Sequence, residues 1–279
     1  MFNLLEFANL LYNNLSSCPE FKTPADCYNC ISTHFYQSDG NEKYDCYKGL
    51  AHYIMDYGPC YASSTYHFLE TSKVLEGLKK ENIKILSIGC GFAPDYYAFD
   101  KYINDKNLSI CFDYCGIELN NQWDLFHQAT PVKNKKINYI DVLKMRIPNF
   151  SLFDLVFMDK VFSSLSESEG RDRFLQFLSG YIKGFMKDDA VLIYKDVNER
   201  SRGRDDFDTS ISPLFTDVER YVFNHPGVYK DWSHTIIDIN DLDNVFVNIP
   251  ANISVQPKSN VMKEFVYVYK NKIIQGVNP

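Results

Sequence analysis

The stretch ILSIGCGFAPD, Ile85–Asp95, is a short apolar run that ends on Gly89, Cys90 and Gly91 and continues into Pro94. An apolar run of this length, bounded by turn residues, is typical of a buried strand. Glycines let the backbone bend sharply and let a ligand approach closely, because no Cβ intervenes. A proline is well suited to the first turn of a helix. The stretch therefore predicts a strand, a ligand-contacting turn and a helix in succession.

Apolar runs alternate with helical patterns along much of the remaining chain. Further strands are expected at Ile110–Glu118, Ile137–Ile140, Phe153–Met158 and Ala190–Val197. Segments with helical periodicity lie between these runs, and another helix is expected near Phe215–Phe223. Strands that alternate with helices predict a parallel sheet that is covered on both faces.

The end of the chain differs from this pattern. Two strand-like segments, His234–Ile239 and Lys263–Asn271, have no helical pattern between them and predict a terminal antiparallel hairpin. In open sheets of this class, ligands bind beyond the carboxyl ends of the strands, near the switch point beside the first strand. We therefore expect the turn at Gly89–Asp95 to lie at the ligand site.

Composition and charge limit the classes of function. Of the 279 residues, 45% are hydrophobic and 23% are charged, which is typical of a folded globular protein rather than a disordered chain. A formal charge of −7 does not steer the protein toward nucleic acid or an anionic membrane. No apolar run has the length needed to span a bilayer. The opening residues, MFNLLEFANLLYNNL, predict an amphipathic helix rather than a secretion signal, and we expect a cytoplasmic location.

Cysteines are concentrated near the start of the chain. Four residues spaced Cys-x2-Cys-x3-His-x11-Cys could hold a structural zinc ion in a tetrahedral site: Cys27, Cys30, His34 and Cys46. Cys18 is an alternative to His34, which would give a four-cysteine site. The competing interpretation is a set of reduced cysteines packed beneath neighbouring tyrosines. If zinc is bound, its expected role is to stabilise a loop-rich segment.

The end of the second strand-like run narrows the choice of cofactor. This run ends in Glu118, and an acid at that position can accept hydrogen bonds from both hydroxyls of a ribose. A dinucleotide-binding turn needs a third glycine where this chain has Pro94, which argues against a nicotinamide-dependent enzyme. The alternative is a methyl-donor cofactor, which has no phosphates to accommodate.

Four segments carry a family resemblance: ILSIGCGFA, CGIELN, INYIDVLK and FDLVFMDK. They occur in the order seen in class I S-adenosylmethionine-dependent methyltransferases, and the chain resembles this family over about Ile83–Lys272. The resemblance implies an α/β fold with a doubly wound, mostly parallel seven-stranded sheet and an antiparallel C-terminal strand. It implies S-adenosylmethionine as the cofactor and transfer of its methyl group as the reaction.

The resemblance also implies roles for single residues. Gly89 and Gly91 would lie under the methionine part of the cofactor, Glu118 would hold its ribose, and Asp141 would lie near its adenine amino group. Ser87 stands where the family commonly has an acid. The implied cofactor site therefore consists of Ser87, Gly89, Cys90, Gly91, Glu118, Asp141 and Met158.

Asp159, which follows Met158, is the candidate general base, with a pocket wall or a cofactor contact as the other interpretations. The Asn-Pro-Pro-Tyr motif of methyltransferases that act on nucleic-acid bases is missing, and DKVFSSL stands in its place. A small molecule or a protein is therefore favoured over nucleic acid as the acceptor, and no membrane is expected as a partner.

Three further hypotheses concern the domain division, one aromatic segment and an alternative function. We expect residues 1–62 to form a helical and Cys-rich extension, and residues 63–279 to form the methyltransferase domain. The segment Tyr57–Phe68 either covers the cofactor or acceptor, as the resemblance implies, or packs its aromatic rings between a helix and the sheet. The alternative function is a non-catalytic module that uses the cofactor pocket to recognise a protein or nucleic acid.

Overall fold

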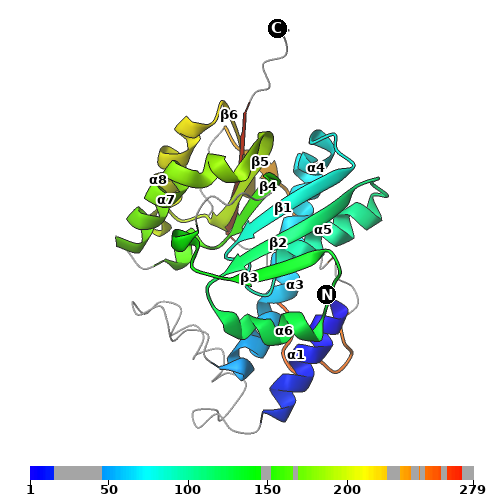
Figure 1. Cartoon of the computed structure of the whole chain (residues 1–279). Coiled ribbons are helices and arrows are strands. Elements are labelled where there is room, and N and C mark those ends of the chain that lie inside the picture. Colours follow the sequence, from blue (N-terminus) through cyan, green and yellow to red (C-terminus); the bar gives the residue numbers. More distant parts are fainter. Residues whose placement is uncertain are drawn as a thin grey trace.

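A mixed sheet of eight strands forms the centre of the computed structural model (Figure 1). The structure describes residues 1–15, 46–145, 152–165, 169–224, 233–239, 245, 249–258 and 263–271. The strand order across the sheet is β3-β2-β1-β4-β5-β8-β6-β7. The strands are β1 (Asn82–Ile88), β2 (Cys111–Glu118), β3 (Lys135–Tyr139), β4 (Phe153–Asp159), β5 (Met186–Val197), β6 (Asp217–Phe223), β7 (Thr235–Ile237) and β8 (Glu264–Lys270).

The strand directions agree in part with those expected. The first five strands are parallel to one another, and β8 is antiparallel to both of its neighbours, β5 and β6. The sheet has one strand more than the seven expected, because Asp217–Phe223 forms β6 where a helix is predicted. The predicted terminal hairpin is also wrong, since β7 pairs with β6 in parallel and not with β8.

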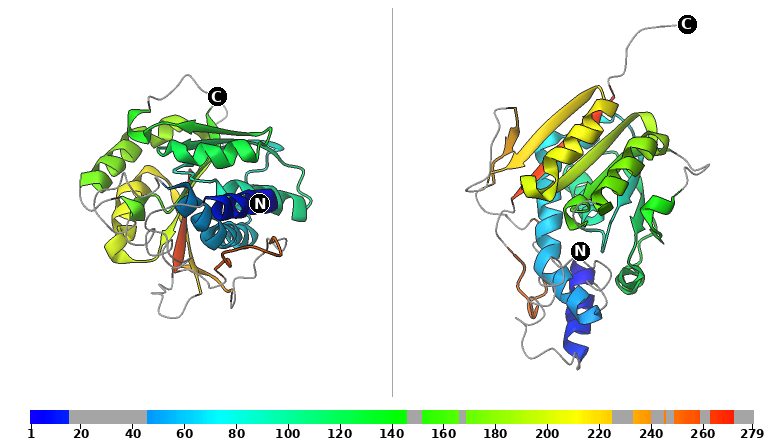
Figure 2. Two further views of the ribbon diagram at one scale, coloured as in Figure 1. Left: turned by 90° about the horizontal axis from the view of Figure 1, so that it is seen from below. Right: turned by 90° about the vertical axis from the view of Figure 1, so that its left-hand side faces the viewer.

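Helices cover both faces of the sheet, and Figures 1 and 2 show α7 and α8 on the opposite side from α3 and α5. The α-helices are α1 (Phe2–Asn14), α3 (Tyr47–Ser72), α4 (Val74–Gly77), α5 (Pro94–Asp105), α6 (Asp124–Ala129), α7 (Glu169–Phe185) and α8 (Arg204–Ile211). Short 3-10 helices are η1 (Asn121–Trp123), η2 (Val142–Lys144), η3 (Phe162–Ser164), η4 (Arg200–Arg202) and η5 (Ser212–Leu214).

Two hydrophobic cores lie on the two faces of the sheet. Successive side chains of a strand point to opposite faces, so each inner strand contributes to both cores. In β4, Leu155 and Phe157 join the core under α3 and α5, while Val156 and Met158 join the core under α7. Burial on both faces explains why β1, β4 and β5 are nearly continuous apolar runs.

The long helix α3 connects the N-terminal part of the chain to the sheet. It runs without interruption from Tyr47 to Ser72, past the expected boundary between residues 62 and 63. Helix α1, which agrees with the amphipathic helix predicted there, packs against α3, and both contribute to the same core as β1. The division into residues 1–62 and 63–279 stays a prediction. Within the described part of the chain, no helix is both long and apolar enough to span a membrane.

Candidate functional site

A cavity of about 780 Å³ lies where the carboxyl ends of β1, β2 and β4 meet. Its walls are the turn after β1, the end of β2, the turn after β3, the end of β4, and tyrosine side chains from α3. This is the edge of the sheet at which ligands of open α/β proteins bind. Of the seven residues predicted to bind the cofactor, six line the cavity: Ser87, Gly89, Cys90, Gly91, Glu118 and Asp141.

The turn after β1 has a backbone shape that requires glycine. Gly89 and Gly91 have φ angles of +67° and +52°, in the left-handed region that other residues rarely adopt. A Cβ on Gly89 would lie 2.5 Å from Cγ2 of Val161, which follows β4. The turn therefore lies close against the end of β4, and it presents backbone rather than side chains to the cavity. A cradle of this kind fits a ligand that needs close backbone approach.

Gly91 is held in place by hydrogen bonds from both sides. Its amide donates to Oε2 of Glu118 at 2.8 Å, and its carbonyl oxygen lies 2.9 Å from Nε2 of His127. Burial is the main reason that the pKa of His127 falls to about 4, so the ring is neutral at pH 7 and donates its Nε2 proton to the carbonyl. The sequence analysis missed this role of His127, which depends on α6 packing against the turn.

Glu118 combines burial with a set of backbone donors. Its Oε1 accepts hydrogen bonds from the amides of Leu119 and Asn120, each at 2.9 Å. Burial raises the pKa of Glu118, while these amides and that of Gly91 act in the opposite direction. Ionised carboxylate oxygens have about four acceptor positions, so acceptor capacity remains for a ribose. Its role as a ribose ligand remains a prediction.

An unexpected acid lies at the cavity wall. Asp95, in the first turn of α5, is 2% exposed, and the Tyr114 hydroxyl donates its single proton between the two oxygens of this carboxyl, at 2.9 and 3.0 Å. Burial raises its pKa to about 6, against the opposing effect of hydrogen bonds from Ser87 and Tyr114. Ser87 at the end of β1 is hydrogen-bonded to this carboxyl, which comes from the following helix.

The raised pKa of Asp95 predicts a pH-dependent contribution to stability. The pKa is about 6 in the folded protein and about 3.9 in an unfolded chain. The folded state therefore binds the proton more tightly, so this contribution is complete below about pH 4 and is lost as the pH rises through about 6. Relative to wild type, Asp95→Asn is expected to gain about 3 kcal/mol in unfolding free energy between about pH 4 and about pH 7. Denaturant titrations of both proteins measure this gain, and the same difference at both pH values would contradict it.

The remaining predicted residues occupy three different environments. Asp141 caps η2, and its Oδ1 accepts a hydrogen bond from the Leu143 amide at 3.0 Å. The thiol of Cys90 is buried, which raises its pKa well above the usual value and keeps it neutral. Met158 is fully buried in the core under α7 and does not line the cavity, so its position does not support the expected cofactor contact.

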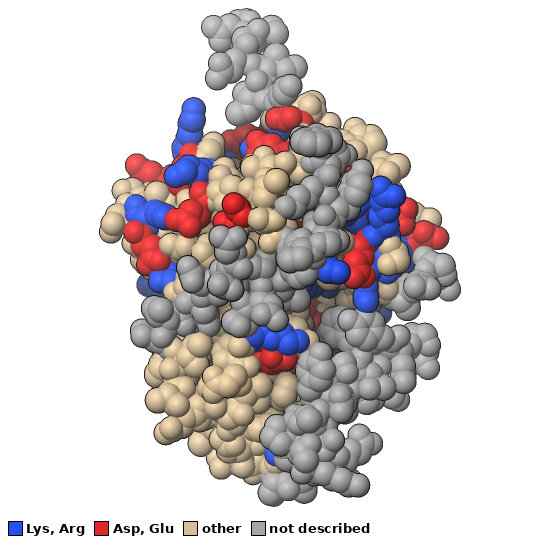
Figure 3. All heavy atoms as spheres, turned by 180° about the vertical axis from the view of Figure 1, so that it is seen from behind, with Lys and Arg blue, Asp and Glu red and all other residues tan. Residues whose placement is uncertain are grey.

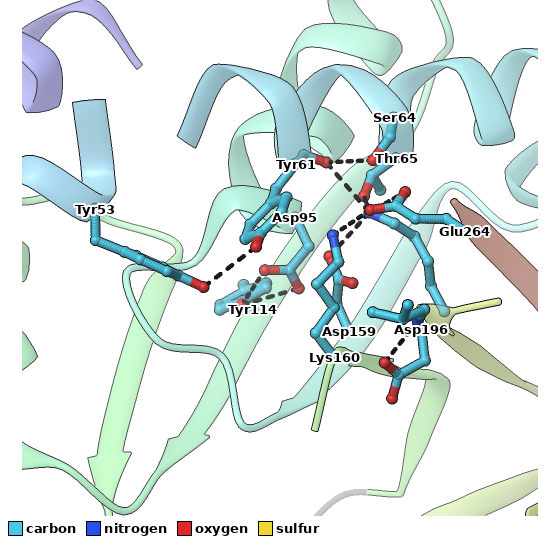
Figure 4. Close-up of polar contacts among 12 residues, drawn as sticks. Tyr53, Tyr61, Ser64, Thr65, Asp95, Tyr114, Asp159, Lys160, Asp196 and Glu264 are labelled. Carbon is cyan, nitrogen blue, oxygen red and sulfur yellow. Dashed lines mark hydrogen bonds and ion pairs between the residues drawn. The ribbon is translucent and has the colours of Figure 1, made fainter. Parts of the chain in front are cut away.

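Asp159 lies at the cavity wall in a buried network of charges (Figure 4). Its Oδ2 accepts a hydrogen bond at 2.9 Å from Lys195, whose side chain is completely buried. Lys195 Nζ also lies 3.7 Å from Glu264, the first residue of β8, and Glu264 is paired with Lys160. Burial alone would lower the pKa of Lys160, but Glu264 and Asp159 outweigh it and raise that pKa. The formal charges of the two lysines and the two acids sum to zero.

Helix α3 supplies an aromatic wall to the same part of the cavity. Tyr53, Tyr57, Tyr61 and Thr65 are spaced four residues apart and so share one face of α3. Tyr53 and Tyr61 line the cavity, and their hydroxyl oxygens are 3.4 Å apart. Within the segment Tyr57–Phe68, Tyr61 lines the cavity and Phe68 is buried in the core, and a role in covering the cofactor or acceptor stays a prediction. The four-residue spacing was the available signal in the sequence.

The structure gives no support for a metal site. Cys46 is exposed at the N-terminal end of α3, and no group of three or more potential ligands occurs among the residues described. Cys18, Cys27, Cys30 and His34 lie outside the described ranges. The zinc site therefore stays a prediction.

Comparison with known proteins identifies the fold. No protein-family model and no curated protein matches the chain. The solved structure of the plantazolicin methyltransferase BpumL with SAH matches with a TM-score of 0.52 at 12% identity, over 96% of this chain and 99% of that one. The chain has the fold of class I S-adenosylmethionine-dependent methyltransferases. A proposed class I methyltransferase from Listeria monocytogenes matches this fold with a TM-score of 0.50 at 12% identity, over 99% of this chain and 89% of that one.

Proposed function

We propose that this protein binds S-adenosylmethionine in the 780 Å³ cavity and transfers its methyl group to an acceptor. The observation that carries the proposal is the meeting of the glycine turn with Glu118 and Asp141 around one cavity, in a chain with the methyltransferase fold. The turn would support the methionine part, Glu118 the ribose and Asp141 the adenine. When bound, the cofactor supplies a methyl group that is activated by a positively charged sulfur.

The proposed reaction depends more on the positioning of the two reactants than on acid–base catalysis. Displacement at a methyl group depends mainly on alignment of the acceptor with the methyl carbon, and holding two reactants in that geometry is what a preformed cavity provides. The aromatic wall of α3 excludes water from one side, and Tyr53 and Tyr61 keep their protons because burial raises the pKa of each well above the usual value. Asp159 then remains as the ionisable base beside these tyrosines in the cavity lining.

A nicotinamide cofactor fits the site poorly. In dinucleotide-binding folds, the pyrophosphate lies at the N-terminus of the helix that follows the glycine turn. Here the first turn of that helix carries Pro94 and the buried carboxyl of Asp95, both of which line the cavity. An acid at this place repels a phosphate group.

The surface gives no particular support to nucleic acid as a partner. On the face shown in Figure 3, the lysines and arginines that the structure describes are mixed with aspartates and glutamates. A nucleic-acid site is expected to gather basic side chains on one face. The formal charge of −7 also disfavours nucleic acid as a partner. We therefore favour a small molecule or a protein as the acceptor.

Calorimetric titration with S-adenosylmethionine, S-adenosylhomocysteine and NAD⁺ tests the proposal. Both adenosyl ligands are expected to bind one site per chain with micromolar affinity, and NAD⁺ is not. In Gly89→Ala, a Cβ would approach Val161 at 2.5 Å on a strained backbone, so this variant is expected to lose most of the affinity. Gly180→Ala is the matched control, because a Cβ there meets nothing within 4 Å.

The outcomes separate the competing functions. Binding of NAD⁺ without either adenosyl ligand would favour a nicotinamide-dependent enzyme. If the folded protein binds none of the three ligands, the non-catalytic module becomes the better explanation.

A further inference from the structure

We propose that the methyl acceptor is an amine, which this chain takes up as its protonated form between the aromatic wall of α3 and the carboxylate of Asp159. The inference deepens the proposed function and rests on it. It is carried by three features at one end of the cavity: aromatic rings, a carboxylate oxygen that has no hydrogen-bond donor among the residues described, and two lysines that are already paired with acids.

Four aromatic side chains from three separate segments line this end of the cavity. Tyr53 lies 6.1 Å from Phe92 in the glycine turn and 6.2 Å from Trp123 after β2, measured between ring centroids. Phe92 and Trp123 are 5.6 Å apart, and Tyr61 is 6.1 Å from Tyr53. Aromatic ring faces attract cations, and this attraction is strongest where water is excluded. A wall of this composition favours a positively charged group with an apolar body.

One oxygen of the Asp159 carboxylate has no hydrogen-bond donor among the described residues. Its Oδ2 is bonded to Lys195, whereas Oδ1 is buried and has no hydrogen-bond partner among the residues described. A buried acceptor without a donor costs free energy, and a ligand that supplies an N–H group recovers it. The Asp159 side chain is 11% exposed and lines the cavity, so a ligand in the cavity lies beside it.

The nearby lysines cannot serve as binding groups for an anionic acceptor. Lys195 uses its three N–H donors on the Tyr61 carbonyl, the Thr65 hydroxyl and Asp159. Lys160 is paired with Glu264, and its Nζ lies 3.4 Å from the ring centroid of Tyr61. Figure 4 shows Lys160, Asp159 and Glu264 close together beneath α3.

The remaining charge near this end of the cavity is negative. The two lysines and the two acids of the network cancel, and the carboxyl of Asp95 lies close enough to Asp159 for the two charges to repel. Asp95 also lines the cavity. A carboxylate acceptor would add a second uncompensated negative charge beside that of Asp95, whereas an ammonium group would offset it. The balance of charge therefore favours an amine.

The transfer step balances with the groups present. The bound ammonium gives one proton to the Asp159 carboxylate, which leaves a neutral amine with its lone pair. That lone pair forms a bond to the methyl carbon while the carbon–sulfur bond breaks and leaves its electrons on sulfur. The products are a methylated ammonium and a neutral thioether, and Asp159 returns its proton to water when the product leaves.

Sinefungin, a cofactor analogue that carries an amino group in place of the methylated sulfur, probes this site without knowledge of the acceptor. In calorimetric titrations, wild type is expected to bind sinefungin about tenfold more tightly than S-adenosylhomocysteine, because the ammonium meets Asp159 and the rings. In Asp159→Asn this preference is expected to fall below about twofold, with little change in affinity for S-adenosylhomocysteine. Asp113→Asn, an exposed acid on β2, is the matched control.

Two further titrations distinguish the effect of charge from that of the N–H donor and test the aromatic wall. S-adenosylmethionine has the positive charge but no N–H donor at this position, so its affinity is expected to fall less than that of sinefungin in Asp159→Asn. Tyr53→Leu removes one ring without disturbing the charge network, and it is expected to reduce the sinefungin preference about threefold. This variant also provides a readout if Asp159→Asn does not fold.

Three results would overturn the inference. They are equal wild-type affinity for sinefungin and S-adenosylhomocysteine, a preference that survives in folded Asp159→Asn, and an equal loss of S-adenosylmethionine and sinefungin binding in that variant. The last result would assign Asp159 to the charge of the cofactor rather than to the acceptor. If wild type binds none of the ligands, the proposed function itself fails, and the inference fails with it.

Discussion

Replacement of Lys195 by methionine is expected to lower the free energy of unfolding by about 3–5 kcal/mol, because it leaves buried carboxylates without their cation. Lys195 is completely buried, and its partner Glu264 is 1% exposed, so water cannot take the place of the lost ammonium. Glu264 keeps Lys160, but Asp159 loses its only hydrogen-bond donor among the described residues. Denaturant-induced unfolding, followed by fluorescence or circular dichroism, measures the change.

Two comparisons show whether the loss comes from the buried charges. Lys144→Met removes a lysine whose side chain is 83% exposed, and its effect is expected to stay within about 0.5 kcal/mol. The double variant Lys195→Met, Asp159→Asn removes one charge of each sign and is expected to recover part of the loss. A single-variant loss below about 1 kcal/mol would mean that water in the cavity solvates Asp159 well enough to replace Lys195.

Glu118→Ala is expected to weaken binding of S-adenosylhomocysteine about 100-fold. One hydrogen bond to an ionised carboxylate is worth up to about 3 kcal/mol, which corresponds to that factor in affinity. The substitution also removes the acceptor for the Gly91 amide, so the glycine turn loses its anchor to β2. Calorimetric titration of the variant measures the loss, and a thermal melt establishes that the variant is folded.

Control variants separate the two contributions of Glu118. Glu118→Gln keeps one acceptor oxygen for the Gly91 amide, so its affinity is expected to lie between those of wild type and Glu118→Ala. Asp113→Asn removes an exposed acid from the same strand and is expected to bind as wild type does. Unchanged affinity in Glu118→Ala would contradict a ribose-binding role for this residue.

The core of the sheet is predictable from sequence because its signals are local. Strands β1, β4 and β5 are apolar runs bounded by turn residues, and both of their faces are buried as such runs imply. The segment Asp217–Phe223 misleads, because Val218, Tyr221 and Val222 also follow helical spacing. Pairing with β8 on one side and β7 on the other decides in favour of a strand, and that pairing depends on residues far along the chain.

The residues of the candidate site are predictable from sequence only where they belong to a recognisable motif. The glycine turn, Glu118 and Asp141 follow from the order of segments along the chain, and the structure brings them to one cavity. Tyr61 belongs to the segment Tyr57–Phe68 that the sequence singles out, but Tyr53 does not, and Gly58 and Pro59 between them disfavour the helix that brings both rings to one face. The burial of Asp95 arises only when α5 packs on Tyr114 of β2, which no local pattern reveals.

The position of β8 has a consequence for the way the protein is made. This strand is the last described element in the sequence, yet it lies inside the sheet between β5 and β6 and contributes Glu264 to the charge network. During synthesis on the ribosome, chains emerge and fold from the N-terminal side. Lys160 and Lys195 thus leave the exit tunnel well before their shared carboxylate does. The buried charge network can form only after that final strand has been inserted, so a chain that stalls before Glu264 has the glycine turn but lacks the carboxylate that pairs with both lysines.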